Sequence, residues 1–153
     1  MHFPTQLLSQ KSYIYQIMEP SQIKLLLIDD DEDDRDFFRM AVAEVDYPVH
    51  CELAASATQG FKILAAQQFL PHFVFLDLNM PGIDGRACLK ELKSNAETQA
   101  IPVVIYSTSS EPKDVEETKQ LGAVHFMTKP TGLDQLVHHI NNFLKTNITN
   151  QNK

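Results

Sequence analysis

Apolar runs of strand length alternate with stretches of helical periodicity along this chain, and this alternation restricts the fold more than any other feature. The runs predicted as strands are residues 23–28, 49–54, 73–78, 101–106 and 123–127. The stretches predicted as helices are residues 33–45, 58–68, 86–94, 112–121 and 133–144. Continuously apolar strands are typical of parallel sheets, whose strands are buried on both faces. The pattern therefore predicts an α/β fold, a doubly wound five-stranded parallel sheet with helices on both faces.

The two ends of the 153-residue chain differ in composition from this alternating part. Residues 1–20 are rich in Gln, Ser and Tyr and end at Pro20, so we expect an N-terminal extension outside the core, either flexible or read from an upstream start. A start at Met18, just before the first strand, is the alternative beginning. Residues 147–153 are predicted to be a frayed tail, since chain ends without packing signals fray. The sequence thus predicts one domain over residues 21–146.

The negative charge of the chain is concentrated in one short segment. Residues 29–36 contain seven acids and Arg35, a net charge of −6 out of −7 for the whole chain. The sequence has no basic stripe, so we expect no nucleic-acid partner. Cys51 and Cys88 lie far apart without a CxxC motif, which favours reduced thiols in the cytoplasm. No apolar run approaches the roughly 20 residues of a membrane span, so we expect no membrane partner.

Polar residues follow four of the five predicted strands at the point where each strand ends. They are Asp29, Asp30 and Asp31 after the first strand, Asp77 in the third, Ser107 and Thr108 after the fourth, and Lys129 after the fifth. The carboxyl ends of parallel strands share one edge of the sheet, where ligands bind. Oxygen ligands suit Mg²⁺, which keeps several waters and bridges to phosphate. An ammonium and a hydroxyl bind phosphate oxygens, and a carboxylate can accept a phosphoryl group. The sequence therefore predicts a magnesium-dependent phosphoryl site at this edge.

Four segments in this order resemble the receiver domain of bacterial two-component response regulators. They are "LLLIDDD", "FVFLDLNMPGIDG", "PVVIYSTSS" and "GAVHFMTKP", within residues 22–146. The spacing from Asp77 to Ser107 is 30 residues, and that from Ser107 to Lys129 is 22 residues, as in the family. The resemblance implies the flavodoxin-like sheet order 2-1-3-4-5. It also implies a stand-alone receiver similar to the chemotaxis regulators, because no output domain follows.

The resemblance assigns a metal and phosphoacceptor role to four residues. It implies that Asp77 is the phosphoacceptor and a metal ligand, with Asp30 directly on Mg²⁺ and Asp29 held to it through water. The backbone carbonyl of Asn79 is expected to complete the metal shell.

Three further positions receive roles in switching from the same resemblance. Ser107 is expected to bind the phosphoryl group and move towards it, and Thr108 takes this role if the loop is shifted by one residue. Lys129 is expected to form a salt bridge to the phosphoryl group. Phe126 matches the aromatic residue that turns inward, and ordinary core packing is its alternative interpretation. Asn79 and Ser109 match positions that tune dephosphorylation.

The implied function is a switch, not an enzyme, beyond its own magnesium-dependent phosphorylation and dephosphorylation. A sensor histidine kinase or a histidine phosphotransfer protein would donate the phosphoryl group to Asp77, and an unidentified downstream protein would read the result by contact. One alternative is a receiver-like scaffold that is never phosphorylated. Another is a phosphatase of the haloacid type, which needs a second acid where Asn79 stands.

The remaining acids and serines have structural interpretations. Asp31 is expected to cap the first helix, because Asp is favoured at this position. Residues 32–34 are acids in the first turn, where they favour the helix macrodipole, and we expect them to be solvated. Ser109 or Ser110 is expected to cap the helix that begins near residue 112.

Overall fold

The computed structural model describes residues 22–66 and 68–151, and the extension predicted over residues 1–20 lies outside these ranges. Its strands are β1 (Ile23–Ile28), β2 (Val49–Ala54), β3 (Phe73–Leu76), β4 (Val103–Ser107) and β5 (His125–Thr128). Its helices are α2 (Glu32–Val42), α3 (Ala57–Ala65), α4 (Gly85–Ser94), α5 (Pro112–Gln120) and α6 (Leu133–Gln151). All five strands are parallel, in the order β2-β1-β3-β4-β5. The predicted doubly wound sheet and its order are confirmed.

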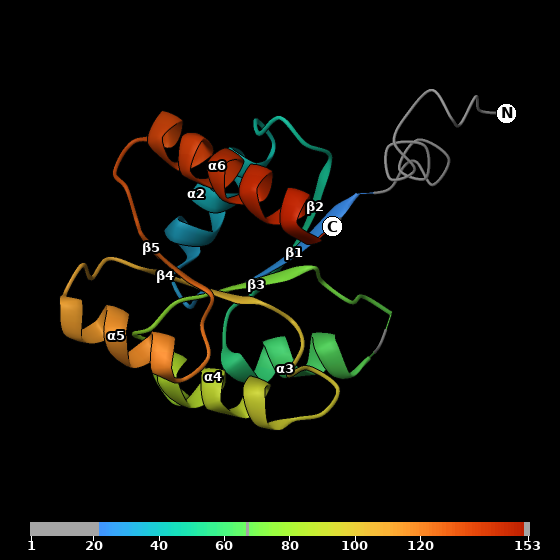
Figure 1. Ribbon diagram of the computed structural model, residues 1–153, viewed down its shortest axis with the longest axis vertical. Coiled ribbons are helices and arrows are strands. Elements are labelled where there is room, and N and C mark those ends of the chain that lie inside the picture. The colour runs from blue at the N-terminus through green and yellow to red at the C-terminus, as the bar shows by residue number, and fades with distance from the viewer. Residues whose placement is uncertain (1–21, 67, 152–153) are drawn as a thin grey trace, which may run out of the picture.

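Helices cover both faces of the sheet, as Figure 1 shows, with α2 and α6 on one side and α3, α4 and α5 on the other. The side chains of β1 alternate between the two cores. Leu25 and Leu27 pack under α2 and α6, whereas Leu26 and Ile28 pack under α3 and α4. All four are fully buried. Burial on both faces explains why this strand is continuously apolar.

The last helix is longer than its periodicity predicted. It continues to Gln151, whereas the sequence predicted an end at residue 144 and a frayed tail over residues 147–153. Ile148 packs against the core on the α2 side, and the Asn147 side chain donates a hydrogen bond of 2.8 Å to the Phe143 carbonyl. These contacts extend the helix through a segment whose Asn and Thr content favours loops.

Two expectations from composition can be compared with the described residues. Cys51 is half-buried and Cys88 is buried, and both are free thiols, as expected. Burial raises the pKa of each thiol to about 12, so neither is a reactive thiolate. Within residues 22–66 and 68–151, no helix has the length and apolarity that crossing a bilayer requires.

Candidate functional site

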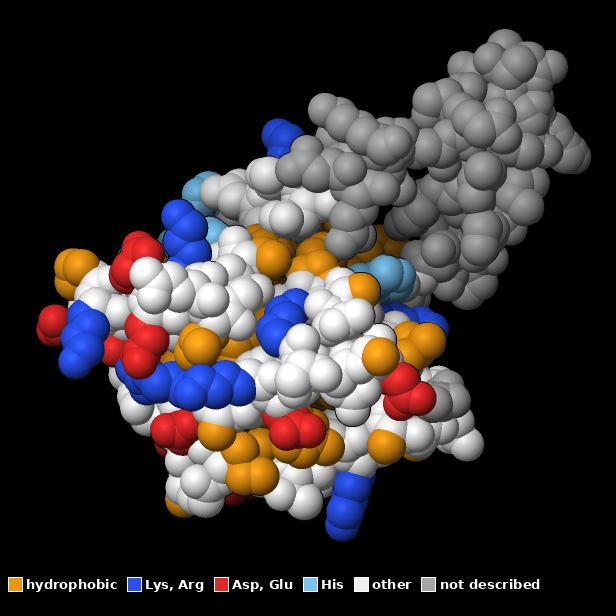
Figure 2. Space-filling model, turned by 60° about the horizontal axis from the view of Figure 1, so that its bottom comes forward, with side chains coloured by type: hydrophobic (Ala, Val, Ile, Leu, Met, Phe, Trp, Pro, Cys, Tyr) orange, Lys and Arg blue, Asp and Glu red, His pale blue; other side chains and the backbone are white. Residues whose placement is uncertain are grey.

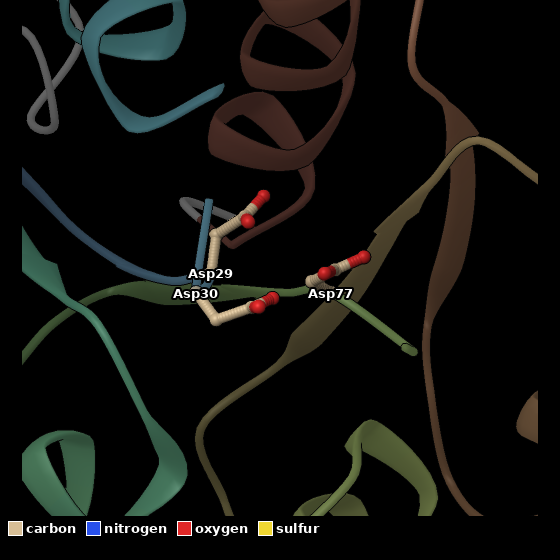
Figure 3. A group of neighbouring side chains, drawn as sticks. All are labelled: Asp29, Asp30 and Asp77. Carbon is tan, nitrogen blue, oxygen red and sulfur yellow. The ribbon is translucent and has the colours of Figure 1, made fainter. Parts of the chain in front are cut away.

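Three carboxylates meet at the carboxyl ends of the two central strands. Asp29 is the first residue after β1, Asp30 follows it, and Asp77 is the first residue after β3. Strands β1 and β3 pair with Ile28 opposite Leu76, so Asp29 and Asp77 leave the sheet side by side. Each of the three acids has a carboxylate oxygen within 4.8 Å of the others. Figure 3 shows the three side chains at the ends of their strands. This is the point where the strand order reverses, which is the usual ligand position in open α/β sheets.

Asp29 has one carboxylate oxygen that lacks a hydrogen bond. Its Oδ1 accepts the Asp31 N–H at 3.0 Å, whereas Oδ2 is buried without a hydrogen-bond partner. The Lys129 Nζ atom lies 2.8 Å from Oδ2, but this contact is an ion pair outside hydrogen-bond geometry. Burial raises the pKa of Asp29, and the neighbouring ammonium opposes this shift. The Lys129 ammonium is therefore the cation that this buried oxygen faces, although it does not donate a well-aligned hydrogen bond to it.

Lys129 lies between three carboxylates. Its Nζ atom is 2.8 Å from Asp29 Oδ2, 2.8 Å from Asp34 Oδ2 and 3.5 Å from Asp77 Oδ1. The ammonium also lies 5.2 Å from the centre of the Tyr106 ring, within the range of a cation–π contact. Burial alone would lower the pKa of Lys129, but the hydrogen-bonded and neighbouring carboxylates raise it overall. The site therefore contains a permanent positive charge.

The carboxyl group of Asp77 is buried among like charges. Burial contributes most to its pKa shift, followed by the negative charges of Asp29 and Asp30, while Lys129 opposes them. Together these effects raise the pKa of Asp77 from 3.8 to about 6. The single ammonium therefore does not neutralise the cluster, and a further cation would relieve the repulsion.

The donor set fits a hard divalent cation. All candidate ligands are carboxylate oxygens, and Asp29 Oδ2 is buried without a hydrogen bond. Mg²⁺ and Mn²⁺ prefer such oxygen ligands together with water. Asp30 is exposed, so water can reach this side of the cluster. Asn79, two residues after Asp77, lies in the exposed part of the loop between β3 and α4.

The hydroxyl candidate lies at the end of the next strand. Ser107 is the last residue of β4 and is buried, whereas Thr108 is exposed. The Ser107 Oγ atom accepts the Ser109 N–H at 3.1 Å, and the Ser107 carbonyl accepts the Lys129 N–H at 2.7 Å. Phe126, on β5, is half-buried and packs against the core on the α4 side. The structure therefore brings Ser107 and Lys129 to the same edge of the sheet as the carboxylates.

The acids of the first helical turn do not all behave as the sequence predicted. Asp31 caps α2 through its Oδ1 atom, which accepts the Asp34 N–H at 3.0 Å, as expected. Asp34 was expected to be solvated, but its side chain is 37% exposed and pairs with Lys129. Residues 34 and 129 are 95 positions apart, so no local pattern could predict this contact.

Two more residues near the site were not recognised from the sequence. The Arg35 guanidinium donates a hydrogen bond of 2.9 Å to the Asp29 carbonyl, which fastens α2 to the end of β1. Gly85 begins α4 directly beside the backbone of Asp77. A Cβ atom on Gly85 would lie 2.2 Å from the Asp77 carbonyl oxygen and 2.6 Å from the Leu78 Cα atom. Only glycine allows this approach.

The predicted serine cap of α5 is wrong. The N-cap position is occupied by Glu111, whose side chain makes no capping hydrogen bond. Ser109 instead bridges two parts of the turn, because its Oγ atom accepts the Glu111 N–H at 3.1 Å and donates to Asp114 Oδ2 at 2.6 Å. The first helical residue is a proline, whose fixed φ favours the start of a helix without a side-chain cap.

A chain of polar contacts connects the Ser107 loop to two helices. Asp114 accepts hydrogen bonds from the Ser109 hydroxyl and from the Arg86 Nη2 atom, the latter at 2.6 Å. The Arg86 Nε atom donates to Glu117 at 2.5 Å. Because Ser109 also donates its N–H to Ser107, the polar chain runs from the end of β4 through α5 to α4.

Fold and site together define a flavodoxin-like α/β domain with an acidic, lysine-containing pocket at the carboxyl ends of its strands. The sequence model of the family described as "Response regulator receiver domain" matches residues 25–141. The chain therefore belongs to the response regulator receiver domain family, which confirms the resemblance of its four segments.

Individual relatives agree with this assignment. The response regulator Rre1 of Synechocystis is 34% identical over 122 residues, which are 80% of this chain and 52% of Rre1. A probable cyclic di-GMP phosphodiesterase of Vibrio cholerae is 30% identical over 82% of this chain, which spans only 27% of that protein. The phosphorylated cyanobacterial phytochrome response regulator RcpA has a TM-score of 0.73 at 28% identity, covering 82% of this chain and 93% of RcpA. The Mn²⁺-bound form of response regulator Rcp1 has a TM-score of 0.69 at 25% identity, covering 79% of this chain and 91% of Rcp1.

Membership in the family supports three general statements. Receiver domains are regulated by histidine kinases or phosphotransfer proteins within two-component signalling. They bind a divalent metal, as the Mn²⁺-bound form of Rcp1 illustrates. Receivers of the chemotaxis type are generally switches and not catalysts.

Proposed function

We propose that this protein is a phosphorylation-controlled switch in which Asp77 accepts a phosphoryl group from a histidine of a sensor kinase or phosphotransfer protein. The observation that supports this proposal is the position of Asp77. It is buried at the end of β3, among two further carboxylates and 3.5 Å from the Lys129 ammonium. Burial and the neighbouring carboxylates leave the negative charge of Asp77 only partly neutralised. A metal ion bound together with the phosphoryl group would offset this charge.

The proposed transfer is a displacement at phosphorus. A carboxylate oxygen of Asp77 attacks the phosphorus of the donor phosphohistidine, an O–P bond forms, and the N–P bond to the imidazole breaks. The departing imidazole keeps the electron pair of that bond and takes up a proton. Lys129 donates hydrogen bonds to the phosphoryl oxygens, and Ser107 supplies a hydroxyl from the neighbouring strand end.

We propose Mg²⁺ as the metal, with Asp30 as a direct ligand, Asp29 as a ligand through water, and Asn79 contributing its backbone carbonyl. When bound, the cation offsets negative charge on the phosphoryl oxygens. Few protein ligands and an exposed side favour Mg²⁺, which retains several waters, over a cation that needs a full protein cage.

The proposed signal leaves the site through the Ser107 loop. If Ser107 moves towards the phosphoryl group, the Ser109 N–H bound to its Oγ atom moves too, and the polar chain through Asp114 and Arg86 carries the shift to α5 and α4. A reversal from 1:99 to 99:1 between the two states requires about 5.5 kcal/mol. Several charge-assisted hydrogen bonds in a buried site are sufficient for this preference.

The proposed readout surface contains β5 with the adjoining sides of α5 and α6. Phe126 is among the residues that line two hollows there, one of ≈ 430 Å³ towards α6 and one of ≈ 290 Å³ towards α5. An unidentified downstream protein would bind this surface. On the face shown in Figure 2, Lys and Arg side chains are interspersed with Asp and Glu, which supports a protein partner over a nucleic acid. We place the protein in the cytoplasm, where its thiols stay reduced.

The test is incubation with acetyl phosphate, a small phosphodonor, in Mg²⁺ or in EDTA, followed by intact-mass measurement and peptide mapping. We expect one phosphoryl group on Asp77, only in Mg²⁺. Asp77→Asn abolishes it, whereas Asp33→Asn, which removes an exposed acid, does not. The adduct should decay slowly.

Other results would favour the alternatives. Hydrolysis of many equivalents of donor without an accumulating adduct would indicate a phosphatase. A chain that never takes up phosphoryl, from acetyl phosphate or from a kinase, would be a scaffold. Equal labelling of Asp77→Asn and the parent would refute the assignment of the acceptor.

A further inference from the structure

The Lys129 ammonium is held unequally by its three acidic neighbours. It lies 2.8 Å from Asp29 and from Asp34 but 3.5 Å from Asp77. Charge-assisted N–H···O bonds measure about 2.7–2.9 Å, so the distance to Asp77 exceeds a hydrogen bond. Two carboxylates therefore keep the ammonium away from the third.

We propose that Asp34 is a positioning residue that holds Lys129 off Asp77 and so leaves the Asp77 oxygens free for a cation. Among the described residues, Asp34, on the first turn of α2, is the one carboxylate that pairs with Lys129 from outside the group of three candidate metal ligands. Asp29 is itself a candidate ligand, so its hold on Lys129 competes with metal binding. Asp34 can keep its contact with Lys129 whether or not a metal is bound.

Hydrogen bonds of the backbone and of the next residue fix the position of Asp34 beside Lys129. The Asp34 N–H donates to the capping Asp31 side chain at 3.0 Å, and the next residue, Arg35, donates to the Asp29 carbonyl at 2.9 Å. The first turn of α2 is thus held by its cap at Asp31 and by the bond from Arg35 to the residue that follows β1. The Tyr106 ring, 5.2 Å from Nζ at its centroid, adds a contact from the core.

Removing Asp34 should weaken metal binding in two ways. The pocket loses one negative charge, and the freed ammonium moves towards Asp77, where it competes with the cation for the same oxygen. The first effect is shared by any nearby acid, whereas the second requires contact with Lys129. Asp33 is exposed in the same helical turn, so Asp33→Asn is the matched control for charge alone.

The proposal depends on the metal of the proposed function but not on phosphorylation, so it is tested without a phosphodonor by calorimetric titration with Mg²⁺. We expect Asp34→Asn to weaken binding about five-fold, or about 1 kcal/mol. Asp33→Asn should stay within about two-fold. Asp34→Glu should restore most of the affinity. In a Lys129→Met background, Asp34→Asn should have no more effect than Asp33→Asn, because the residue acts through Lys129.

Equal losses in Asp34→Asn and Asp33→Asn, or an undiminished loss without Lys129, would overturn the proposal. A metal-free crystal structure of Asp34→Asn tests independently whether Asp34 positions the ammonium, even if the parent binds no Mg²⁺. The Lys129 Nζ to Asp77 Oδ1 distance should shorten from 3.5 Å to about 2.9 Å. An unchanged distance would show that Asp34 does not position the ammonium.

Discussion

Replacing Asp77 with asparagine should stabilise the metal-free protein at neutral pH, although it removes the proposed acceptor. The side chains are nearly the same shape, so the replacement leaves no cavity. The difference is charge, because Asp77 is buried beside Asp29 and Asp30 and its pKa is raised to about 6. Ionising such a group costs the folded state more than the unfolded state.

The magnitude follows from the two pKa values. Below pH 3.8 the carboxyl group is protonated in both states, and the fold loses nothing. Between pH 3.8 and about 6 the folded state binds more protons, so the free energy of unfolding falls as the pH rises. The loss is complete above this window and amounts to about 3 kcal/mol at pH 8, against about 1 kcal/mol at pH 4.5. Asp77→Asn has no such titration.

The assay is urea unfolding of the parent and of Asp77→Asn in EDTA at both pH values. We expect the variant to be more stable by about 3 kcal/mol at pH 8 and by about 1 kcal/mol at pH 4.5. Adding Mg²⁺ at pH 8 should reduce the difference in the free energy of unfolding between the two proteins, because only the parent has the Asp77 carboxylate as a candidate ligand. Asp33→Asn serves as the exposed control. A parent that is as stable as Asp77→Asn in EDTA at pH 8 would refute the reasoning.

Two further predictions concern the backbone beside the site and one histidine. Gly85→Ala should lower the free energy of unfolding by about 1–3 kcal/mol and slow phosphorylation, because its Cβ would collide with the Asp77 carbonyl. In the control Gly132→Ala, the atom nearest to the new Cβ is the mobile end of Gln135 at 3.4 Å. Urea unfolding of this control should therefore show little change. His72 accepts the Lys24 N–H at Nδ1 over 2.9 Å, and burial, with the Lys24 charge, lowers its pKa below 6.5. The contribution of neutral His72 to the free energy of unfolding is therefore present above pH 6.5 and is lost as the pH falls through the lowered pKa. Between pH 7.5 and 5 the parent should lose stability relative to His72→Asn, which keeps an acceptor. An equal change in the free energy of unfolding of the two proteins between these pH values, measured by urea unfolding, would contradict this.

The order and type of the elements, and the edge of the sheet where polar residues collect, were predictable from the residues alone. Strand burial produces continuous apolar runs, and parallel connections place every strand end on one side. Asp29, Asp77, Ser107 and Lys129 could therefore be placed together before any distance was known. The capping role of Asp31 was also predictable, because it depends on neighbours three residues away.

The ion pairs between these groups could not be predicted, because they depend on the packing of distant segments. Three features each depend on how two distant segments pack: the pairing of Asp34 with Lys129, the ion pair of Asp29 with the same ammonium, and the approach of Gly85 to Asp77. Periodicity reports which face of an element is buried, and it carries no information on which side chain of one element meets another. A contact across 95 residues is set by the docking of α2 beside the end of β5, and it became visible only once those two elements were in place.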